Sequence, residues 1–104
     1  MSARHTAIIR VPNNHPALAG HFPSNPVVPG VLVLERLLAA AEERIGHALR
    51  VRGLAHAKFP APLLPEEAAL ARFRIEGDRL EFEVEHAGRV ITRGAFDLSD
   101  GADE

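Results

Sequence analysis

Residues 29–46, PGVLVLERLLAAAEERIG, predict the one helix around which this 104-residue chain is organised. Pro29 or Gly30 suits its start, because the N–H group that proline lacks has no partner in the first turn of a helix. Gly46 suits its end, because glycine readily adopts the left-handed conformation that closes many helices. We therefore expect a helix that begins at residue 29 or 30 and ends at residue 44 or 45.

The first half of this helix is expected to be buried, because its apolar residues fall on all sides. These residues are Val31, Leu32, Val33, Leu34, Leu37 and Leu38. Glu35 is the exception, since its helical neighbours three and four residues away are apolar and cannot neutralise a carboxylate. A buried carboxylate is costly unless it is paired or protonated. The sequence therefore predicts that Glu35 has a partner that lies outside the helix.

The charge pattern near the end of the chain predicts an antiparallel meander. A two-residue turn at Gly77-Asp78 would oppose Glu76 to Arg79, Ile75 to Leu80, Arg74 to Glu81, Phe73 to Phe82 and Arg72 to Glu83. Apolar pairs then share one face and opposite charges share the other, and a shift of one residue would destroy both patterns. A three-residue turn at residues 86–88 is expected to add a strand that ends near Leu98. It would oppose Glu85 to Arg89, Val84 to Val90 and Glu81 to Arg93.

Two further strands are expected at residues 5–11 and 49–59, before and after the helix. Residues 12–29 hold five prolines and form a long loop, which in a compact domain tends to be functional. One strand, a loop, a buried helix and four strands give an α+β architecture in which a sheet wraps around one helix. Residues 1–98 are expected to form a single domain, and residues 99–104 a mobile acidic tail.

The composition excludes several classes of function for this chain. A formal net charge of −2 argues against nucleic acid as a partner. The absence of cysteine excludes disulfides and thiolate chemistry. No signal peptide or run of membrane-spanning length is found, so we expect a cytoplasmic protein that does not act on membranes. His15 lies near His21, but no acidic or histidine cluster completes a metal site.

Most of the functional information lies in residues 21–35, HFPSNPVVPGVLVLE. This segment joins His21, in a proline-stiffened loop, to Glu35 in the helix. A histidine titrates near neutrality, and burial favours the protonated form of a carboxyl group, so the two form a candidate acid–base pair. Each residue alone also suits a structural role: a loop histidine bonded to the backbone, or a carboxylate that holds an interface.

The string His-Phe-Pro-x-x-Pro-x-x-Pro-Gly-Val-Leu-x-x-Glu, here residues 21–35, resembles the signature of the β-hydroxyacyl-[acyl-carrier-protein] dehydratases. Residues 57–65, AKFPAPLLP, look like the family's strand after the helix. The resemblance implies the hot-dog fold, an antiparallel sheet wrapped around a central helix. The helix lacks the family's usual glutamine, and Pro65-Glu66-Glu67 stands where the family usually has Pro-Gly-Asp. These departures suggest a short accessory member or one of a polyketide-like or aryl-polyene pathway.

Catalytic roles follow from the resemblance. It implies that His21 removes a proton next to a thioester carbonyl, and that Glu35 helps the β-hydroxyl group leave as water, giving a trans-2-enoyl thioester. It also implies a homodimer, with a higher oligomer or a heterodimer with a related subunit as alternatives. In that assembly Glu35 would meet His21 of the partner subunit.

The binding residues are expected around the start of the helix. Gly30 opens the helix, where unpaired N–H groups can stabilise the oxygen of an enolate. Phe22, Pro29 and Val31 are expected to line the substrate pocket.

The implied partner is acyl carrier protein, which presents the acyl chain on 4′-phosphopantetheine. Carrier proteins are acidic, so Arg36, Arg50, Arg52 and Lys58 are candidates to dock it. No cofactor is expected, because the elimination requires only an acid, a base and a group that stabilises the carbonyl oxygen. Two alternatives remain open: a hot-dog thioesterase, and a non-catalytic subunit that binds acyl chains or acts as a scaffold.

Overall fold

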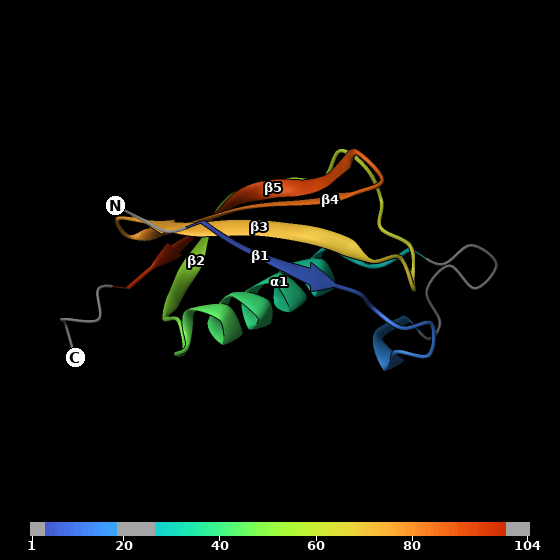
Figure 1. The fold of residues 1–104 in the computed structure, drawn as a ribbon, viewed down its shortest axis with the longest axis horizontal. Helices are drawn as coiled ribbons and strands as arrows, with labels where there is room; N and C mark the ends of the chain where they lie inside the picture. Colours follow the sequence, from blue (N-terminus) through green and yellow to red (C-terminus); the bar gives the residue numbers. More distant parts are fainter. Residues whose placement is uncertain (1–3, 19–26, 100–104) are drawn as a thin grey trace.

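The computed structural model describes residues 4–18 and 27–99. Figure 1 shows a sheet above one long helix. The elements in chain order are β1 (His5–Ile9), the short 3₁₀ helix η1 (Pro16–Leu18), α1 (Gly30–Ile45), β2 (Val51–Lys58), β3 (Ala69–Glu76), β4 (Arg79–His86) and β5 (Arg89–Leu98). The strand predicted at 5–11 is thus observed with two residues fewer at its end, and the strand predicted at 49–59 with two fewer at its start and one fewer at its end.

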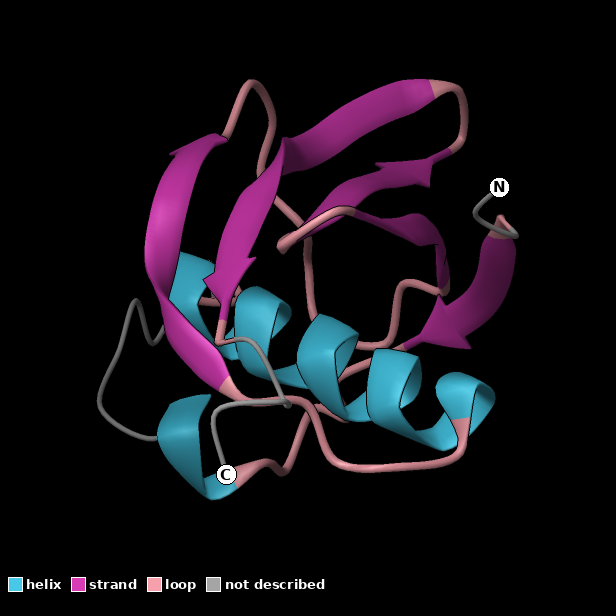
Figure 2. Ribbon diagram, turned by 90° about the vertical axis from the view of Figure 1, so that its left-hand side faces the viewer, coloured by secondary structure: helices cyan, strands magenta, loops and turns pink. Residues whose placement is uncertain are grey.

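The five strands form a single antiparallel sheet in the order β1-β3-β4-β5-β2. The sheet curves over α1, as the rotated view in Figure 2 shows. The predicted α+β architecture, a sheet wrapped around one helix, is confirmed. The described part of the chain contains no helix with the length and hydropathy needed to cross a bilayer.

The predicted bounds of the helix are confirmed. Gly46 has φ 98° and donates its N–H to the carbonyl of Glu42 at 2.8 Å, which closes the last turn. The side chains that face the sheet are buried: Leu32, Val33, Leu34, Leu37 and Ala41. They pack against apolar residues of the strands, of which Phe73, Leu80 and Val84 are among the most buried.

The prediction that the first half of α1 is buried on all sides is wrong for the single chain. Val31 is 66% exposed, and Glu35, Ala39 and Glu43 are also exposed. These residues are spaced four apart, so they form one stripe along the helix. The sheet covers only the opposite side of α1, and within the described residues nothing covers this stripe.

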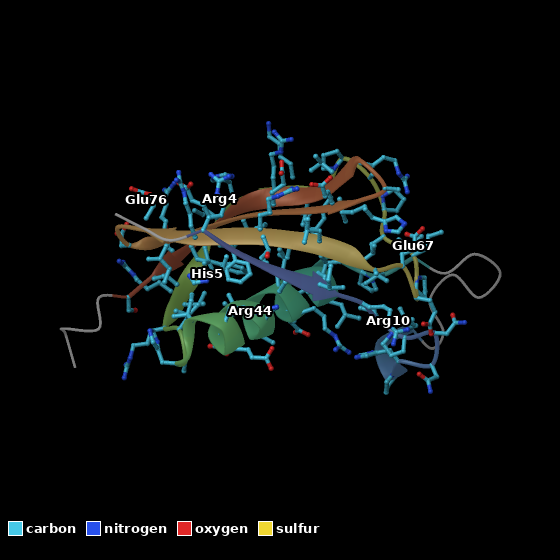
Figure 3. The ribbon with its side chains drawn as sticks, viewed as in Figure 1. Arg4, His5, Arg10, Arg44, Glu67 and Glu76 are labelled. Atoms are coloured by element: carbon cyan, nitrogen blue, oxygen red, sulfur yellow. The ribbon has the colours of Figure 1, made fainter. Side chains whose placement is uncertain are left out.

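The register of the β3–β4 hairpin is confirmed at every predicted pair, from Glu76 opposite Arg79 to Arg72 opposite Glu83. The side chains on its outer face form ion pairs, with Arg74 3.4 Å from Glu81 and Arg72 3.6 Å from Glu83. Figure 3 shows polar and charged side chains projecting from the outer face of the sheet. The predicted face of opposite charges on this hairpin is confirmed.

The predicted three-residue turn between β4 and β5 is wrong. The turn has two residues, Ala87 and Gly88, with φ 52° and 79°, so His86 opposes Arg89. Two positive φ angles favour the tight hairpin turn whose twist matches that of the strands. The register then shifts, so that Glu85 opposes Val90, Val84 opposes Thr92 and Glu83, in place of Glu81, opposes Arg93. The extra residue is Ile91, which is 1% exposed, so the bulge adds a side chain to the core.

The predicted end of the last strand at Leu98 is confirmed. The N–H of Ser99 donates to the carbonyl of Arg50 at 2.7 Å, so the first residue of the predicted tail is bonded to the rest of the chain. Residues 100–104 lie outside the described residues, and the mobile tail stays a prediction.

Gly94 is required where β2 crosses β5. A Cβ atom at this position would lie 2.1 Å from the carbonyl oxygen of His56 and 2.8 Å from the Cα of Ala57. Both neighbours are backbone atoms of β2, so no side-chain rotation relieves the overlap. The absence of a side chain at Gly94 lets the edge strand approach its neighbour.

We expect Gly94→Ala to lower the free energy of unfolding by about 1–3 kcal/mol, the usual cost of overpacking, because β2 must move off β5. Gly53→Ala is the matched control, because a Cβ there meets no atom within 4 Å. Its effect should stay within about 0.5 kcal/mol. Urea denaturation of the two variants checks this, and equal midpoints would contradict the close approach.

Candidate active site

The structure describes four of the six predicted site residues. Pro29, Gly30, Val31 and Glu35 lie at the start of α1 or on it, whereas His21 and Phe22 lie outside the described residues. The predicted pairing of His21 with Glu35 is therefore not visible in the single chain.

The start of α1 presents N–H groups without an acceptor. Pro29 is the N-cap, with φ −57° and ψ 142°, and has no side-chain hydrogen bond to the helix. Its carbonyl accepts from the N–H of Leu32 at 3.0 Å and of Val33 at 3.2 Å. Within the described residues, the N–H groups of Gly30 and Val31 have no acceptor. Free donors at the positive end of a helix favour an oxygen that carries negative charge.

A cavity of about 400 Å³ opens beside this helix start. It is lined mainly by apolar side chains from the helix start, the corner after β2 and one residue of β5. The residues are Val27, Val28, Gly30, Val33, Phe59, Pro60, Ala61, Pro62, Leu63 and Ile91. A cavity with an apolar lining and the N–H of Gly30 at its wall suits an apolar chain attached to a polar, reacting head.

Among the predicted binding residues that the structure describes, Gly30 alone lines this cavity. Val31 was expected to line the pocket, but it lies on the exposed stripe of α1 because the helix turns by about 100° per residue. Pro29 precedes the helix and does not line this cavity either. In the single chain, both residues therefore lie outside the enclosed space.

One hydrogen bond joins the corner after β2 to the segment before the helix, and a second joins the end of β2 to β5. The N–H of Val28 donates to the carbonyl of Leu63 at 2.8 Å. The hydroxyl of Thr92, which is completely buried, donates to the carbonyl of Lys58 at 2.8 Å. The next residue, Phe59, then places its ring so that a Cβ added to Gly30 would lie 3.0 Å from two ring carbons.

Phe59 and Thr92 are site residues that were not singled out from the sequence. Phe59 could have been found, because it stands in the family-like segment 57–65. For Thr92 the sequence held one weak indication of a role, because its hydroxyl group stands in an apolar part of a strand. Their contribution arises from contacts between segments far apart in the chain.

Glu35 is exposed and has no partner among the described residues. It stands five residues after Gly30, or about 7.5 Å along the helix axis. The burial that the sequence predicted for this carboxylate is not provided by its own chain. The carboxylate and the cavity therefore lie on different sides of the same helix start.

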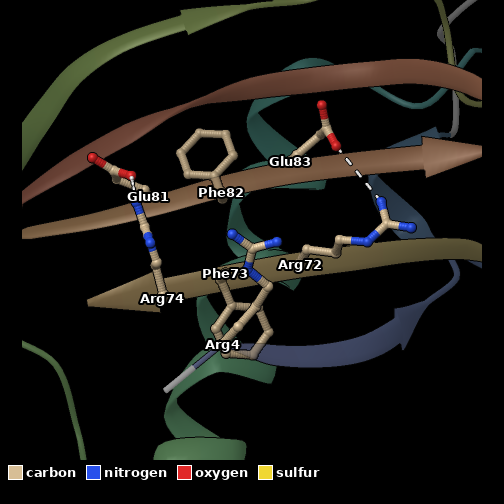
Figure 4. Close-up of a pocket in the computed structure, with 7 residues that line it drawn as sticks. All are labelled: Arg4, Arg72, Phe73, Arg74, Glu81, Phe82 and Glu83. Carbon is tan, nitrogen blue, oxygen red and sulfur yellow. Dashed lines mark hydrogen bonds and ion pairs between the residues drawn. The ribbon is translucent and has the colours of Figure 1, made fainter. Parts of the chain in front are cut away.

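Other polar clusters do not form a competing site. The hollow in Figure 4 lies on the outer face of the sheet, where Arg72 and Arg74 are paired with Glu83 and Glu81. No group of three or more possible metal ligands occurs in the described ranges 4–18 and 27–99.

Residues 1–95 match the family model named ApeI-like, which is described as ApeI dehydratase. The chain belongs to this family. Curated relatives named 3-hydroxyacyl-[acyl-carrier-protein] dehydratase FabZ are also similar. The protein from Myxococcus xanthus (strain DK1622) is 36% identical, over 93% of this chain and 64% of its own. The protein from Anaeromyxobacter sp. (strain K) is 38% identical, over 79% of this chain and 52% of its own.

Solved structures confirm the hot-dog fold. The dehydratase heterocomplex ApeI:P from Xenorhabdus doucetiae contains a chain that matches with a TM-score of 0.82 at 19% identity, over 93% of this chain and 88% of that one. An uncharacterized protein from Erwinia carotovora subsp. atroseptica matches with a TM-score of 0.77 at 18% identity, over 97% and 86% of the two chains. The present chain spans about half to two thirds of the length of the curated relatives described above.

The contact between Gly30 and Phe59 can be tested without an activity assay. We expect the methyl group added by Gly30→Ala to displace the ring, and this cost to offset the gain in helix propensity that alanine otherwise brings. Phe59→Leu should relieve that cost, giving a coupling of about 0.5 kcal/mol or more in a double-mutant cycle. Thermal unfolding of the two single variants and the double variant measures it. Additive effects would show that the ring does not contact the helix start.

Proposed function

We propose that this protein converts a 3-hydroxyacyl thioester to the trans-2-enoyl thioester, with the acyl chain carried on the 4′-phosphopantetheine of acyl carrier protein. Membership of a dehydratase family supports the reaction class, and the names of the FabZ relatives support the substrate. The observation that carries the proposal is the start of α1, where unpaired N–H groups meet an apolar cavity and Glu35 follows on the same helix.

In the proposed reaction, His21 removes the proton on the carbon next to the thioester carbonyl. Negative charge develops on the carbonyl oxygen, where the N–H of Gly30 stabilises it; one such donor is typically worth a factor of about 10²–10³ in rate. Glu35 gives a proton to the β-hydroxyl group, the C–O bond breaks, and water leaves as the double bond forms. No electron is gained or lost, and no cofactor is needed for these steps.

A second chain is part of the proposal, because Glu35 is exposed in the single chain. A homodimer would cover the stripe of α1 and bring Glu35 to His21 of the partner subunit. A heterodimer with a related subunit would do the same, and the similar structure described as a heterocomplex supports that alternative. Membership of the ApeI-like family supports a specialised, aryl-polyene-type role over a housekeeping one. The cytoplasmic location stays a prediction.

The four predicted docking residues for the carrier do not form one patch. Arg36 lies on α1 beside Ile8, Ile9 and Arg10 of the β1 side, whereas Arg52 and Lys58 belong to β2 at the other edge of the sheet. A carrier protein that docks on one side can therefore contact only part of the set.

We expect His21→Ala and Glu35→Gln each to lower turnover by at least about 100-fold, since general acid–base groups typically contribute a factor of 10²–10⁴. The assay follows the absorbance of the conjugated product from 3-hydroxyacyl thioesters loaded on carrier protein. Glu43→Gln is the matched control, because it makes the same change two turns further along the exposed stripe of α1. Its turnover should remain at the wild-type level.

Two outcomes of this assay would favour a different function over the proposed one. Release of free thiol without an enoyl product would indicate a thioesterase. A folded protein that is inert toward a broad panel of acyl chains, also at high chain concentration, would indicate a subunit that binds acyl chains or acts as a scaffold.

The shared site predicts complementation between inactive variants. Mixing equal amounts of His21→Ala and Glu35→Gln after unfolding and refolding should restore roughly a quarter of wild-type turnover. Random pairing makes half of the dimers mixed. In each mixed dimer one of the two sites has both an intact His21 and an intact Glu35, and the other site has neither. Each variant refolded alone is the control. If the mixture remained as inactive as its components, the pair would not be shared between chains.

A further inference from the structure

Glu66, in the corner before β3, has a strained backbone. Its φ of 72° lies in the left-handed region, which glycine enters freely and which costs free energy for a residue with a Cβ atom. Among the described residues, Ala87 in the β4–β5 turn is the other non-glycine residue with a positive φ. The family usually has glycine where Glu66 stands, so the glutamate is a feature of this chain. Such strain persists where surrounding contacts fix a residue, and it is frequent near functional sites.

Glu66 is bonded to three residues of the segment that follows β1. Its N–H donates to the carbonyl of Val11 at 2.8 Å, and its Oε2 accepts the N–H of Asn13 at 2.9 Å. Its Oε1 accepts a hydrogen bond from the guanidinium of Arg10, with which it also forms an ion pair. We call these three contacts the clasp. The clasp joins residues 10–13 to the corner that precedes β3.

The same corner also holds the other end of the loop that joins β1 to α1. Near the end of this loop, the N–H of Val28 donates to the carbonyl of Leu63 at 2.8 Å. Leu63 stands three residues before Glu66, is 1% exposed and lines the apolar cavity. The start and the end of the loop that contains His21 are thus bonded to one short segment. Fixing both ends of a loop reduces the conformations open to the residues between them.

From Asn13 onward the described contacts continue up to Leu18. The N–H of His15 donates to the carbonyl of Pro12 at 3.0 Å, and the N–H of Leu18 donates to the carbonyl of His15 at 2.9 Å. Leu18 is 7% exposed and belongs to the core. It precedes His21 by three residues in the sequence. A shift of residue 13 therefore reaches the residues just before His21 through a continuous series of contacts.

A gain in stability does not account for the strained glutamate. The side chains of Arg10 and Glu66 are 52% and 46% exposed, and an ion pair this open to solvent contributes little to the free energy of unfolding. We propose that Glu66 is a positioning residue of the reaction, and that the clasp fixes the start of the loop carrying His21 relative to the cavity wall. The assignment rests on the proposed function, because it takes His21 as the base.

The experiment compares Glu66→Gly with Ala87→Gly as its matched control. Both substitutions relieve a positive φ angle, but only the first removes the side-chain contacts of the clasp. Misplacing a reacting group by about 1 Å can cost about 100-fold in rate. Since the other anchors of the loop remain, we expect the kcat of Glu66→Gly to fall by about tenfold. Its KM should stay within about twofold of wild type, because the cavity lining is unchanged.

Thermal unfolding separates positioning from stability. The midpoint of Glu66→Gly should stay within about 4 °C of wild type, because relief of the strain offsets the lost contacts. Ala87→Gly should keep the kcat of wild type. Turnover is measured with 3-hydroxyacyl thioesters loaded on carrier protein.

Two further measurements locate the effect at the clasp. Arg10→Met should lower kcat by less than Glu66→Gly, because the bond to Asn13 remains, and adding it to Glu66→Gly should cause no further loss. Hydrogen exchange reports on the clasp without substrate. In Glu66→Gly the N–H of Asn13 should exchange at least about tenfold faster than in wild type. The N–H of Val28, which is bonded to Leu63, should keep its rate.

Several results would overturn the proposal. These are an unchanged kcat in Glu66→Gly, an equal loss in Ala87→Gly, additive losses in the double variant with Arg10→Met, or an unchanged exchange rate at Asn13. A wild-type chain without dehydratase turnover would instead contradict the proposed function, and with it the link from the clasp to His21. The exchange rate at Asn13 would still decide whether the clasp holds the loop, so the two failures are distinguishable.

Discussion

Helix α1 is covered by the sheet on one side only, and the other features of this molecule depend on that asymmetry. The covered side holds Leu32, Val33, Leu37 and Ala41, which anchor the helix under the curved sheet. The uncovered side carries Val31 and Glu35. The apolar side chain of Val31 is thus exposed to water, which does not favour it. The physical reason to expect a second chain is therefore already present in the first turns of α1.

The start of α1 combines two properties: N–H donors that have no acceptor among the described residues, and an apolar cavity beside them. The donors exist because no side chain of the described residues caps the helix after Pro29. The cavity lies beside them because Phe59 and the proline-rich segment, which follow the Thr92-bonded end of β2, lie against Gly30. In such surroundings a hydrogen bond to a developing charge is stronger than in water. The arrangement suits a reaction that places charge on an oxygen and keeps the attached chain out of water.

Local patterns in the sequence predicted the parts of the fold that local chemistry determines. The β3–β4 register followed from alternating apolar and charged pairs, and the ends of α1 followed from Pro29 and Gly46. The β4–β5 register did not follow, because the bulge at Ile91 places a second residue in the core beside Thr92, and alternation cannot reveal an inserted residue. The burial of Glu35 was also beyond prediction, since apolar neighbours do not tell whether the cover comes from the same chain. Gly30 was found from the motif, whereas the contribution of Thr92 needed the three-dimensional contact.

The free edge and the proposed site are joined by two adjacent residues. Lys58 ends β2, and its carbonyl accepts the hydrogen bond from Thr92 that fixes the corner. Phe59 follows at once and lies against Gly30. The same short segment therefore ends the edge strand and closes the cavity.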